Sequence, residues 1–276
     1  MTIGVIGQGY VGTAIKLGFQ DHYNVVTYDK FDLAKSTHSK IADLVEETKV
    51  IFVCVPTPMR KDGTCYTGIV EEVIREINET ATDHIVVIKS TVPPGTTDRF
   101  NHEFSNVTVI FNPEFLTEEN FLDDFKNQNR IILGGSRKGT NKLRQIYSKV
   151  FPQATIVKTG DKHAEMVKYF TNTFLATKVS FANEMYNICR QLDLDYDKVV
   201  EYAIYDERLG KSHWAVPGPD GDFGFGGHCF PKDLSAIINS FDTYGLLEAV
   251  EQVNDQVRED RDWEHMVGRA VLEEDE

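Results

Sequence analysis

The cysteine at position 229 has the sequence surroundings of a reactive thiol. It lies in the run GFGGHCFPKD, residues 224–233, where glycines free the backbone to bend closely around a ligand. Pro231 suits the first turn of a helix, so we expect Cys229 at a helix N-terminus, beside Lys232. A thiol placed there is partly ionised to the nucleophilic thiolate. The run therefore predicts covalent catalysis by Cys229, with Asp233 as an acid, a base or a water-positioning group. A buried and inert cysteine, the commoner role for a single cysteine, stays open on these residues alone.

A lysine and an asparagine stand four residues apart in the helical stretch AEMVKYFTNTF. This spacing puts Lys168 and Asn172 on one face of the helix, one turn apart. Together they can hold and polarise a hydroxyl or carbonyl oxygen, with Lys168 as the electrostatic partner of a developing alkoxide. Such a pair is usually only a solvated helix face, but the apolar neighbours Met166, Val167 and Phe170 favour a functional pair.

Glu114 follows a predicted strand and is flanked by Pro113 and Phe115. A carboxylate in these surroundings is expected to be poorly solvated, which would raise its pKa and make it a useful general base. Glu118, one turn further on, is either an assisting or capping group or an ordinary surface acid.

The hexapeptide GQGYVG fits a dinucleotide-binding turn. It follows the predicted strand TIGVI and opens a helix, which is the context that the G-x-G-x-x-G pattern requires. Gly7 permits the tight turn, Gly9 lets the pyrophosphate approach the backbone, and Gly12 lets the helix pack on the strand. The predicted cofactor contacts in this turn are Gly7, Gly9, Tyr10, Val11 and Gly12.

The next predicted strand, NVVTYD, ends at Asp29, about 20 residues beyond the glycines. A carboxylate there can accept hydrogen bonds from the adenosine ribose and would repel a 2′-phosphate, which predicts NAD rather than NADP. Lys30 lies beside it and could soften that choice. Thr57 and Thr91 follow two further strands at the edge where ligands bind, whereas Cys54 is expected in the core.

Two regions are predicted to position these residues. Over Thr2–Ile156, β-branched runs alternate with helical stretches, which predicts a Rossmann-type doubly wound, mostly parallel sheet with VIFVCV and IVVIK as central strands. Helical periodicity then continues over Asp161–Leu192, which predicts one long helix. A helix near 195–205, a loop rich in Gly and Pro over Gly210–Gly227 and further helices predict an all-helical second region. The acidic tail VLEEDE is expected to fray.

The composition disfavours several classes of function. The 43 acidic and 29 basic residues give a formal charge of −14, which repels nucleic acid and anionic membrane surfaces. The N-terminus lacks the order of a signal peptide and no run of about 18 apolar residues occurs, so we expect a cytoplasmic protein. The four cysteines are far apart, which predicts neither a metal site nor a disulfide framework.

Seven ordered segments resemble the UDP-glucose/GDP-mannose dehydrogenase family, and within it most of all the UDP-glucose 6-dehydrogenases. They span residues 1 to about 244: GQGYVG, CVPTP, KSTVPPGTT, NPEFLTE, AEMVKYFTNTFLATKVSFANE, DERLG and GFGGHCFPKD. The resemblance implies a four-electron oxidation of UDP-glucose to UDP-glucuronate with NAD. An alcohol becomes an aldehyde and then passes through a thiohemiacetal and a thioester on Cys229, which water hydrolyses.

The resemblance also implies roles for other residues. Lys168 and Asn172 fall on positions that stabilise oxyanions, Asp233 on an acid that acts with a water near Thr91, and Glu114 on the residue linked to thioester hydrolysis. Further implied cofactor contacts are Thr57, Thr91, Glu118 and Lys232. The implied substrate contacts are Glu114, Phe115, Leu116, Lys168, Asn172, Arg208, Phe225, Gly226 and Cys229.

Arg208 matches an arginine that in relatives reaches the substrate of the neighbouring subunit, so the resemblance implies a homodimer built on the long helix. We therefore predict an NAD-binding Rossmann domain over residues 1–160, and a connecting helix with a helical substrate and dimerisation domain over residues 161–276. Family members continue into a second Rossmann-like domain that recognises the nucleotide, whereas this sequence ends at Glu276. Recognition of the nucleotide therefore stays open, and a separate polypeptide is one candidate to supply it.

Two other functions stay open. One is a partner-dependent or non-catalytic NAD-binding protein. The other is a two-electron dehydrogenase of 3-hydroxy acids, since such enzymes also carry Lys and Asn four apart on a long helix but need no cysteine loop. The sugar is open too, because relatives handle GDP-mannose and N-acetylated amino sugars; the PKD that follows the CF dipeptide favours UDP-glucose.

Overall fold

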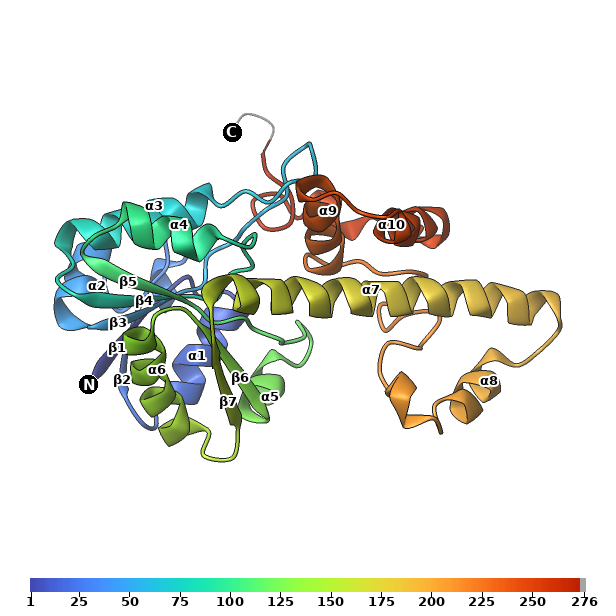
Figure 1. Cartoon of the computed structure of the whole chain (residues 1–276), viewed down its shortest axis with the longest axis horizontal. Coiled ribbons are helices and arrows are strands. Elements are labelled where there is room, and N and C mark those ends of the chain that lie inside the picture. The colour runs from blue at the N-terminus through green and yellow to red at the C-terminus, as the bar shows by residue number, and fades with distance from the viewer. Residues whose placement is uncertain (274–276) are drawn as a thin grey trace. The chain divides into compact units, whose positions relative to one another are not determined.

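The computed structural model describes residues 1–273 and has a seven-stranded sheet near its N-terminus (Figure 1). The spatial order is β2-β1-β3-β4-β5-β6-β7. Strands β1 to β5 are parallel, whereas β6 pairs antiparallel with β5 at Phe111 and Gly134, and β7 is parallel to β6. The predicted Rossmann-type, mostly parallel sheet is thus confirmed. The strands are β1 (Thr2–Ile6), β2 (Asn24–Tyr28), β3 (Val50–Val53), β4 (His84–Ile88), β5 (Val107–Phe111), β6 (Arg130–Gly134) and β7 (Thr155–Thr159).

Helices cover both faces of this sheet, because the central strands β3 and β4 are apolar on both sides and fully buried. Side chains alternate along β3, so that Ile51 and Val53 join one hydrophobic cluster while Val50 and Phe52 join the other. The first cluster includes α2 (Ile41–Glu47), α3 (Gly68–Thr80) and α4 (Thr96–Glu103). The second includes α1 (Tyr10–Phe19), α5 (Phe121–Lys126) and α6 (Arg137–Val150). A short 3-10 helix, η1 (Leu33–Lys35), follows β2.

The predicted long helix is confirmed as α7 (Asp161–Gln191). It ends where Asp193 adopts a left-handed backbone conformation, with φ of 56°, and the Leu194 N–H donates back to Cys189 O. Asp195 then caps the next helix, since its carboxylate accepts the Lys198 N–H. The remaining helices are α8 (Tyr196–Ala203), η2 (Glu207–Leu209), α9 (Phe230–Ser240), α10 (Leu246–Val257) and η3 (Asp262–His265).

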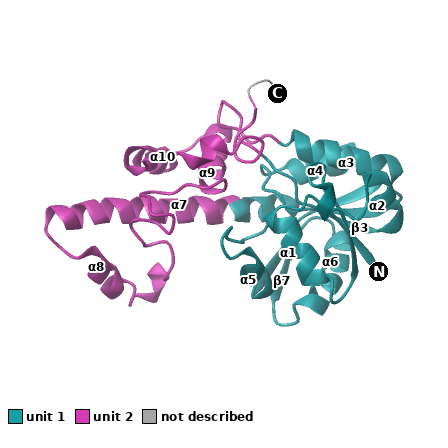
Figure 2. Cartoon of the chain, turned by 180° about the vertical axis from the view of Figure 1, so that it is seen from behind, with its two compact units in different colours: residues 1–57, 67–168 teal, residues 58–66, 169–276 magenta. Residues whose placement is uncertain are grey.

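The chain forms two compact units (Figure 2). Unit 1 comprises residues 1–57 and 67–168, and unit 2 comprises residues 58–66 and the chain from residue 169 onward. The functional division predicted at residue 160 stays a prediction. Among residues 1–273, no helix has both the length and the apolar composition needed to cross a membrane.

Unit 2 is mostly but not entirely helical. The Met59 N–H donates to Ala270 O, and the Leu272 N–H donates to Met59 O, so the segment 58–66 pairs with the end of the chain. The predicted helical second region is confirmed, with this backbone pairing in addition, whereas the prediction that the tail frays is wrong as far as Val271 and Leu272 are concerned. The rest of that prediction, residues 274–276, lies outside the described residues.

Candidate active site

The glycine turn between β1 and α1 has the conformation that its sequence predicts. Gly7 has a φ of +88°, and a Cβ there would lie 2.6 Å from Cys54 O. A Cβ on Gly12 would lie 1.8 Å from Gly7 O, so this glycine lets the helix pack on the turn. Gly9 caps α1 and a Cβ there would meet nothing within 4 Å, which leaves the helix N-terminus open to a ligand at Tyr10 and Val11.

Asp29 is fixed beside this turn. Its Oδ2 accepts the Gln8 N–H at 2.6 Å, and its Oδ1 accepts the N–H groups of Phe31 and Asp32 at 2.9 Å each. Lys30 is exposed and lies over the Phe31 ring. The other predicted cofactor residues of unit 1 are Thr57 and Thr91, which are buried after β3 and β4, and Glu118, which is half-buried before α5.

Lys168 and Glu114 form a buried ion pair in unit 1. Lys168 Nζ donates to Glu114 Oε1 at 3.0 Å and to its main-chain oxygen at 2.8 Å, while the Leu116 N–H donates to Oε2 at 2.7 Å. Burial alone would raise the pKa of Glu114, but Lys168, this N–H and Lys89 together lower it. The predicted raised pKa is therefore wrong, and Glu114 is a carboxylate at neutral pH. The Phe115 ring, half-buried, lies against Lys168 Nζ.

Lys89 is a buried cation that the sequence interpretation left without a role. Its Nζ donates to Asn112 Oδ1 at 3.1 Å and to Pro113 O at 3.4 Å, and Tyr147 donates its hydroxyl to the same Asn112 oxygen. Burial lowers the pKa of Lys89 to about 8. Burial also raises the pKa of Cys54 to about 12, in keeping with the core role expected of that thiol. A lysine that ends the apolar run IVVIK is the signal that could have pointed to this position.

Asp233 holds two of the predicted site residues together in unit 2. This carboxylate is 1 % exposed; its Oδ1 accepts Lys232 Nζ at 2.5 Å and its Oδ2 accepts Asn172 Nδ2 at 2.6 Å. Burial alone would lower the pKa of Lys232, but Asp233 and the thiols of Cys65 and Cys229 raise it. Lys232 is therefore a persistent cation within electrostatic reach of Cys229.

Cys229 is the N-cap of α9, as the sequence predicts, with Pro231 in the first turn. Cys229 is partly exposed, and its carbonyl oxygen accepts the Asp233 N–H at 3.0 Å. The chain reaches it through Gly224 and Gly227, which have φ values of +68° and +70°. The cysteine thus lies at a helix N-terminus, with the Lys232 cation three residues further on.

The remaining predicted substrate contacts are spread more widely. Leu116 is half-buried after β5, and Arg208 projects from η2 with its side chain 88 % exposed, paired with Asp206. The Phe225 ring packs in a hydrophobic cluster of unit 2, and Gly226 follows it in the loop. Contacts of these four residues with a substrate stay predictions.

Two groups of predicted residues are thus each assembled within one unit. In unit 1 Glu114 pairs with Lys168, and in unit 2 Asn172, Lys232 and Asp233 form a hydrogen-bonded chain. Lys168 and Asn172 stand one turn apart on the continuous helix α7. A glycine turn at a helix N-terminus, with a fixed acidic residue just after β2, defines a dinucleotide-binding protein.

The chain belongs to the UDP-glucose/GDP-mannose dehydrogenase family. Residues 29–151 match the NAD binding domain of that family and residues 162–256 match its central domain. The UDP-glucose 6-dehydrogenase AglM of Haloferax volcanii is 33% identical over 304 residues, which cover 92% of this chain and 70% of the relative. The UDP-glucose 6-dehydrogenase TuaD of Bacillus subtilis is 31% identical, and the match covers 93% of this chain but only 63% of TuaD. The structure of a UDP-glucose dehydrogenase from Pyrobaculum islandicum superimposes with a TM-score of 0.83 at 30% identity, covering 92% of this chain and 68% of that one.

Proposed function

We propose that the chain is a nucleotide-sugar 6-dehydrogenase that oxidises UDP-glucose to UDP-glucuronate with NAD, through covalent intermediates on Cys229. The observation that carries the proposal is the position of Cys229 at the N-terminus of α9, beside a lysine that Asp233 keeps charged. A partly exposed cysteine in such a position can act as a covalent nucleophile. Family membership supports the class of reaction, and the substrate and the residue roles are our proposal.

The residues of unit 1 fit NAD. The open helix N-terminus at Gly9 suits the pyrophosphate, and the fixed Asp29 carboxylate suits a ribose hydroxyl while repelling the 2′-phosphate of NADP. NAD, when bound, accepts a hydride in each of the two oxidations. We expect Thr57, Thr91 and Glu118 to line the same site.

The proposed steps balance as one alcohol, two NAD⁺ and one water giving one carboxylate, two NADH and three protons. Lys168 stabilises the alkoxide as the C6 alcohol loses its proton and a hydride to become an aldehyde. The Cys229 thiolate then forms a C–S bond to the aldehyde carbon. A second hydride leaves this thiohemiacetal to give a thioester, and Lys168 and Asn172 stabilise the oxyanion of each tetrahedral species.

Hydrolysis of the thioester needs a water and a proton acceptor. Asp233 accepts hydrogen bonds from both Lys232 and Asn172, which fix the orientation of its carboxylate. We propose that this carboxylate orients the water. Glu114, a carboxylate at neutral pH, is the second acceptor and takes the proton as the C–S bond breaks. Cys229 leaves as a thiolate and is ready for the next turnover.

We also propose a homodimer that buries one face of α7. Phe170, Phe174, Phe181 and Ile188 recur at helical spacing, and each has at least two fifths of its surface exposed. Large apolar side chains in such a stripe usually mark an interaction surface. The exposed Arg208 would then be free to reach the substrate of the second subunit.

A screen of the purified chain for NADH release tests the proposal, with UDP-glucose, GDP-mannose, UDP-N-acetylated amino sugars and 3-hydroxy acids as substrates. We expect NADH with UDP-glucose and none with 3-hydroxy acids. NADH formed with a 3-hydroxy acid alone would favour the two-electron alternative. No NADH with any substrate would leave a partner-dependent or non-catalytic NAD-binding protein as the better account.

A further inference from the structure

Arg258, just beyond the end of α10, is a buried arginine surrounded by carboxylates of unit 2. Its side chain is 3% exposed, and its guanidinium lies 2.7 Å from Asp220, 3.3 Å from Asp262 and 3.4 Å from Asp222. Its Nε also donates to Asp260 O at 2.7 Å. The planar guanidinium can serve several acceptors at once, which a lysine cannot.

Two of these carboxylates in turn hold the glycine loop, residues 220–228, that leads to Cys229. Both oxygens of Asp262 accept the Gly227 N–H, at 3.1 and 3.0 Å, two residues before the thiol. Asp222 accepts the Phe223 N–H at 2.7 Å within the loop and the Asp260 N–H at 2.9 Å outside it. Arg258 contacts Asp220 and Asp222 near the start of the loop, and it contacts Asp262, which accepts the Gly227 N–H near the loop's end. Both ends of the loop are thus tied to the segment 258–262.

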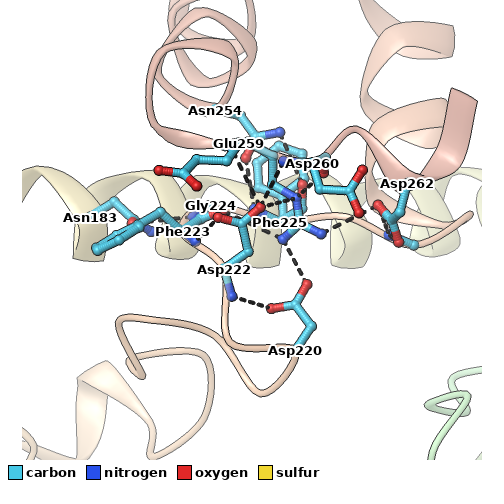
Figure 3. Close-up of polar contacts among 12 residues, drawn as sticks. Asn183, Asp220, Asp222, Phe223, Gly224, Phe225, Asn254, Glu259, Asp260 and Asp262 are labelled. Atoms are coloured by element: carbon cyan, nitrogen blue, oxygen red, sulfur yellow. Dashed lines mark hydrogen bonds and ion pairs between the residues drawn. The ribbon is translucent and has the colours of Figure 1, made fainter.

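Two asparagines hold the middle of the glycine loop. Asn254 on α10 accepts the Phe225 N–H at 2.7 Å and donates to the Phe225 carbonyl at 3.0 Å, so it binds both main-chain groups of one residue (Figure 3). Asn183 on α7 accepts the Gly224 N–H at 3.2 Å. We call Asn183, Asn254, Arg258 and Asp262 the loop brace.

The glycines of this loop allow the brace to approach. A Cβ on Gly224 would lie 2.2 Å from Asn254 Oδ1, and a Cβ on Gly226 would lie 2.2 Å from Arg258 Nη2. From the sequence alone, the glycines of this run were predicted to let the backbone bend closely around a ligand. Contact with the brace is a second reason why no side chain fits at these two positions.

We propose that Arg258 is a positioning residue, which through the loop brace fixes the glycine loop and thereby the position of the Cys229 thiol. The residue lies outside the segment 162–256 that matches the family's central domain. The expected effect of Arg258 on turnover rests on the proposed function. Its role in fixing the glycine loop does not.

Three variants of the full chain test the proposal: Arg258→Lys, which keeps the charge but loses the fork, Arg258→Met, and Asp262→Asn. Arg261→Met is the matched control, since Arg261 lies three residues further on and pairs with Asp255 and Glu264 rather than with the loop. The readouts are amide exchange of the peptide 221–229 against peptides of α7 and unit 1, together with kcat, KM for NAD and Tm. We expect exchange in that peptide to accelerate about tenfold or more and kcat to fall about tenfold, with KM for NAD within about twofold.

Several results would overturn the proposal. Unchanged amide exchange of the peptide 221–229 in variants that fold would show that the brace does not hold the loop. Equally faster exchange in all peptides of unit 2 would show a role in general stability only. Faster exchange of the peptide 221–229 with an unchanged kcat would show that the loop does not position the Cys229 thiol for turnover. If Arg258→Met does not fold, the other two variants carry the test. If the parent chain forms no NADH, the proposed function fails, while exchange still decides whether Arg258 holds the loop.

Discussion

Two buried lysines, one in each unit, have opposite electrostatic surroundings. Lys89 in unit 1 donates to neutral oxygens, those of Asn112 and Pro113, and burial lowers its pKa to about 8. Lys232 in unit 2 is buried to a similar extent but donates to the Asp233 carboxylate at 2.5 Å, and its pKa is raised. The hydrogen-bond partner, and not the depth of burial, therefore distinguishes the pKa shifts of these two lysines.

Among the variants considered, removal of the Asp233 charge should change the free energy of unfolding most. Asp233→Asn replaces the carboxylate that accepts Lys232 Nζ with a neutral amide, the kind of group that Lys89 meets in Asn112, and it leaves a buried cation without its counter-charge. We expect the free energy of unfolding to fall by about 3–5 kcal/mol, measured by urea denaturation at pH 7. Asp255→Asn, on the neighbouring exposed pair with Arg261, is the control and should cost less than about 1 kcal/mol. An equal loss in both variants would contradict this account of Lys232.

The Glu114 pair with Lys168 offers a second test in unit 1. Glu114→Gln keeps the shape of the side chain but removes its charge, and we expect a loss of about 2 kcal/mol at pH 7. Because the pKa of Glu114 is lowered in the folded chain, its contribution is present above its unfolded value and is lost as pH falls through its folded value. The difference between parent and variant should therefore shrink below about pH 4.5. A difference that does not depend on pH would argue against an ionised Glu114.

Lys89 itself should give an effect that changes with pH in the same direction as that of Glu114, but in a more alkaline range. Between about pH 8 and its unfolded value near 10.5, the unfolded chain holds a proton that the folded chain lacks, so stability due to Lys89 rises with pH. We expect the unfolding free energy of the parent relative to Lys89→Met to increase by about 1.4 kcal/mol per pH unit in that range. Urea denaturation at pH 7.5, 8.5 and 9.5 measures it. A flat difference would show that Lys89 keeps its proton in the folded chain.

Local patterns predicted most of the fold. The β-branched runs TIGVI, NVVTYD, VIFVCV and IVVIK correspond to β1 to β4, and sustained helical periodicity predicted α7 to within one residue of its observed end. The pairing of Met59 with Val271 was missed, because contacts between chain segments more than two hundred residues apart leave no periodic pattern in either one. The glycine turn and the N-terminal position of Cys229 were predicted because each depends on neighbours in sequence.

The charge states of the site could not be predicted in the same way. The pKa of Glu114 depends on Lys168, 54 residues further along the chain, and the sequence setting between Pro113 and Phe115 pointed to burial alone. The hydrogen bond between Asn172 and Asp233 joins positions 61 residues apart. Polar and charged partners that meet only through the tertiary fold leave no local signal in the sequence, and Arg258 was overlooked for the same reason.

The stoichiometry of NADH formed per UDP-glucose tests the central claim most directly. With limiting UDP-glucose and excess NAD, the account predicts two NADH per sugar for the parent chain and for Cys189→Ala, which alters a buried thiol outside the proposed site. Cys229→Ser should lose this four-electron stoichiometry and at least about a thousandfold of the turnover rate. One NADH per sugar in the parent, or two from Cys229→Ser at an undiminished rate, would contradict covalent catalysis by Cys229.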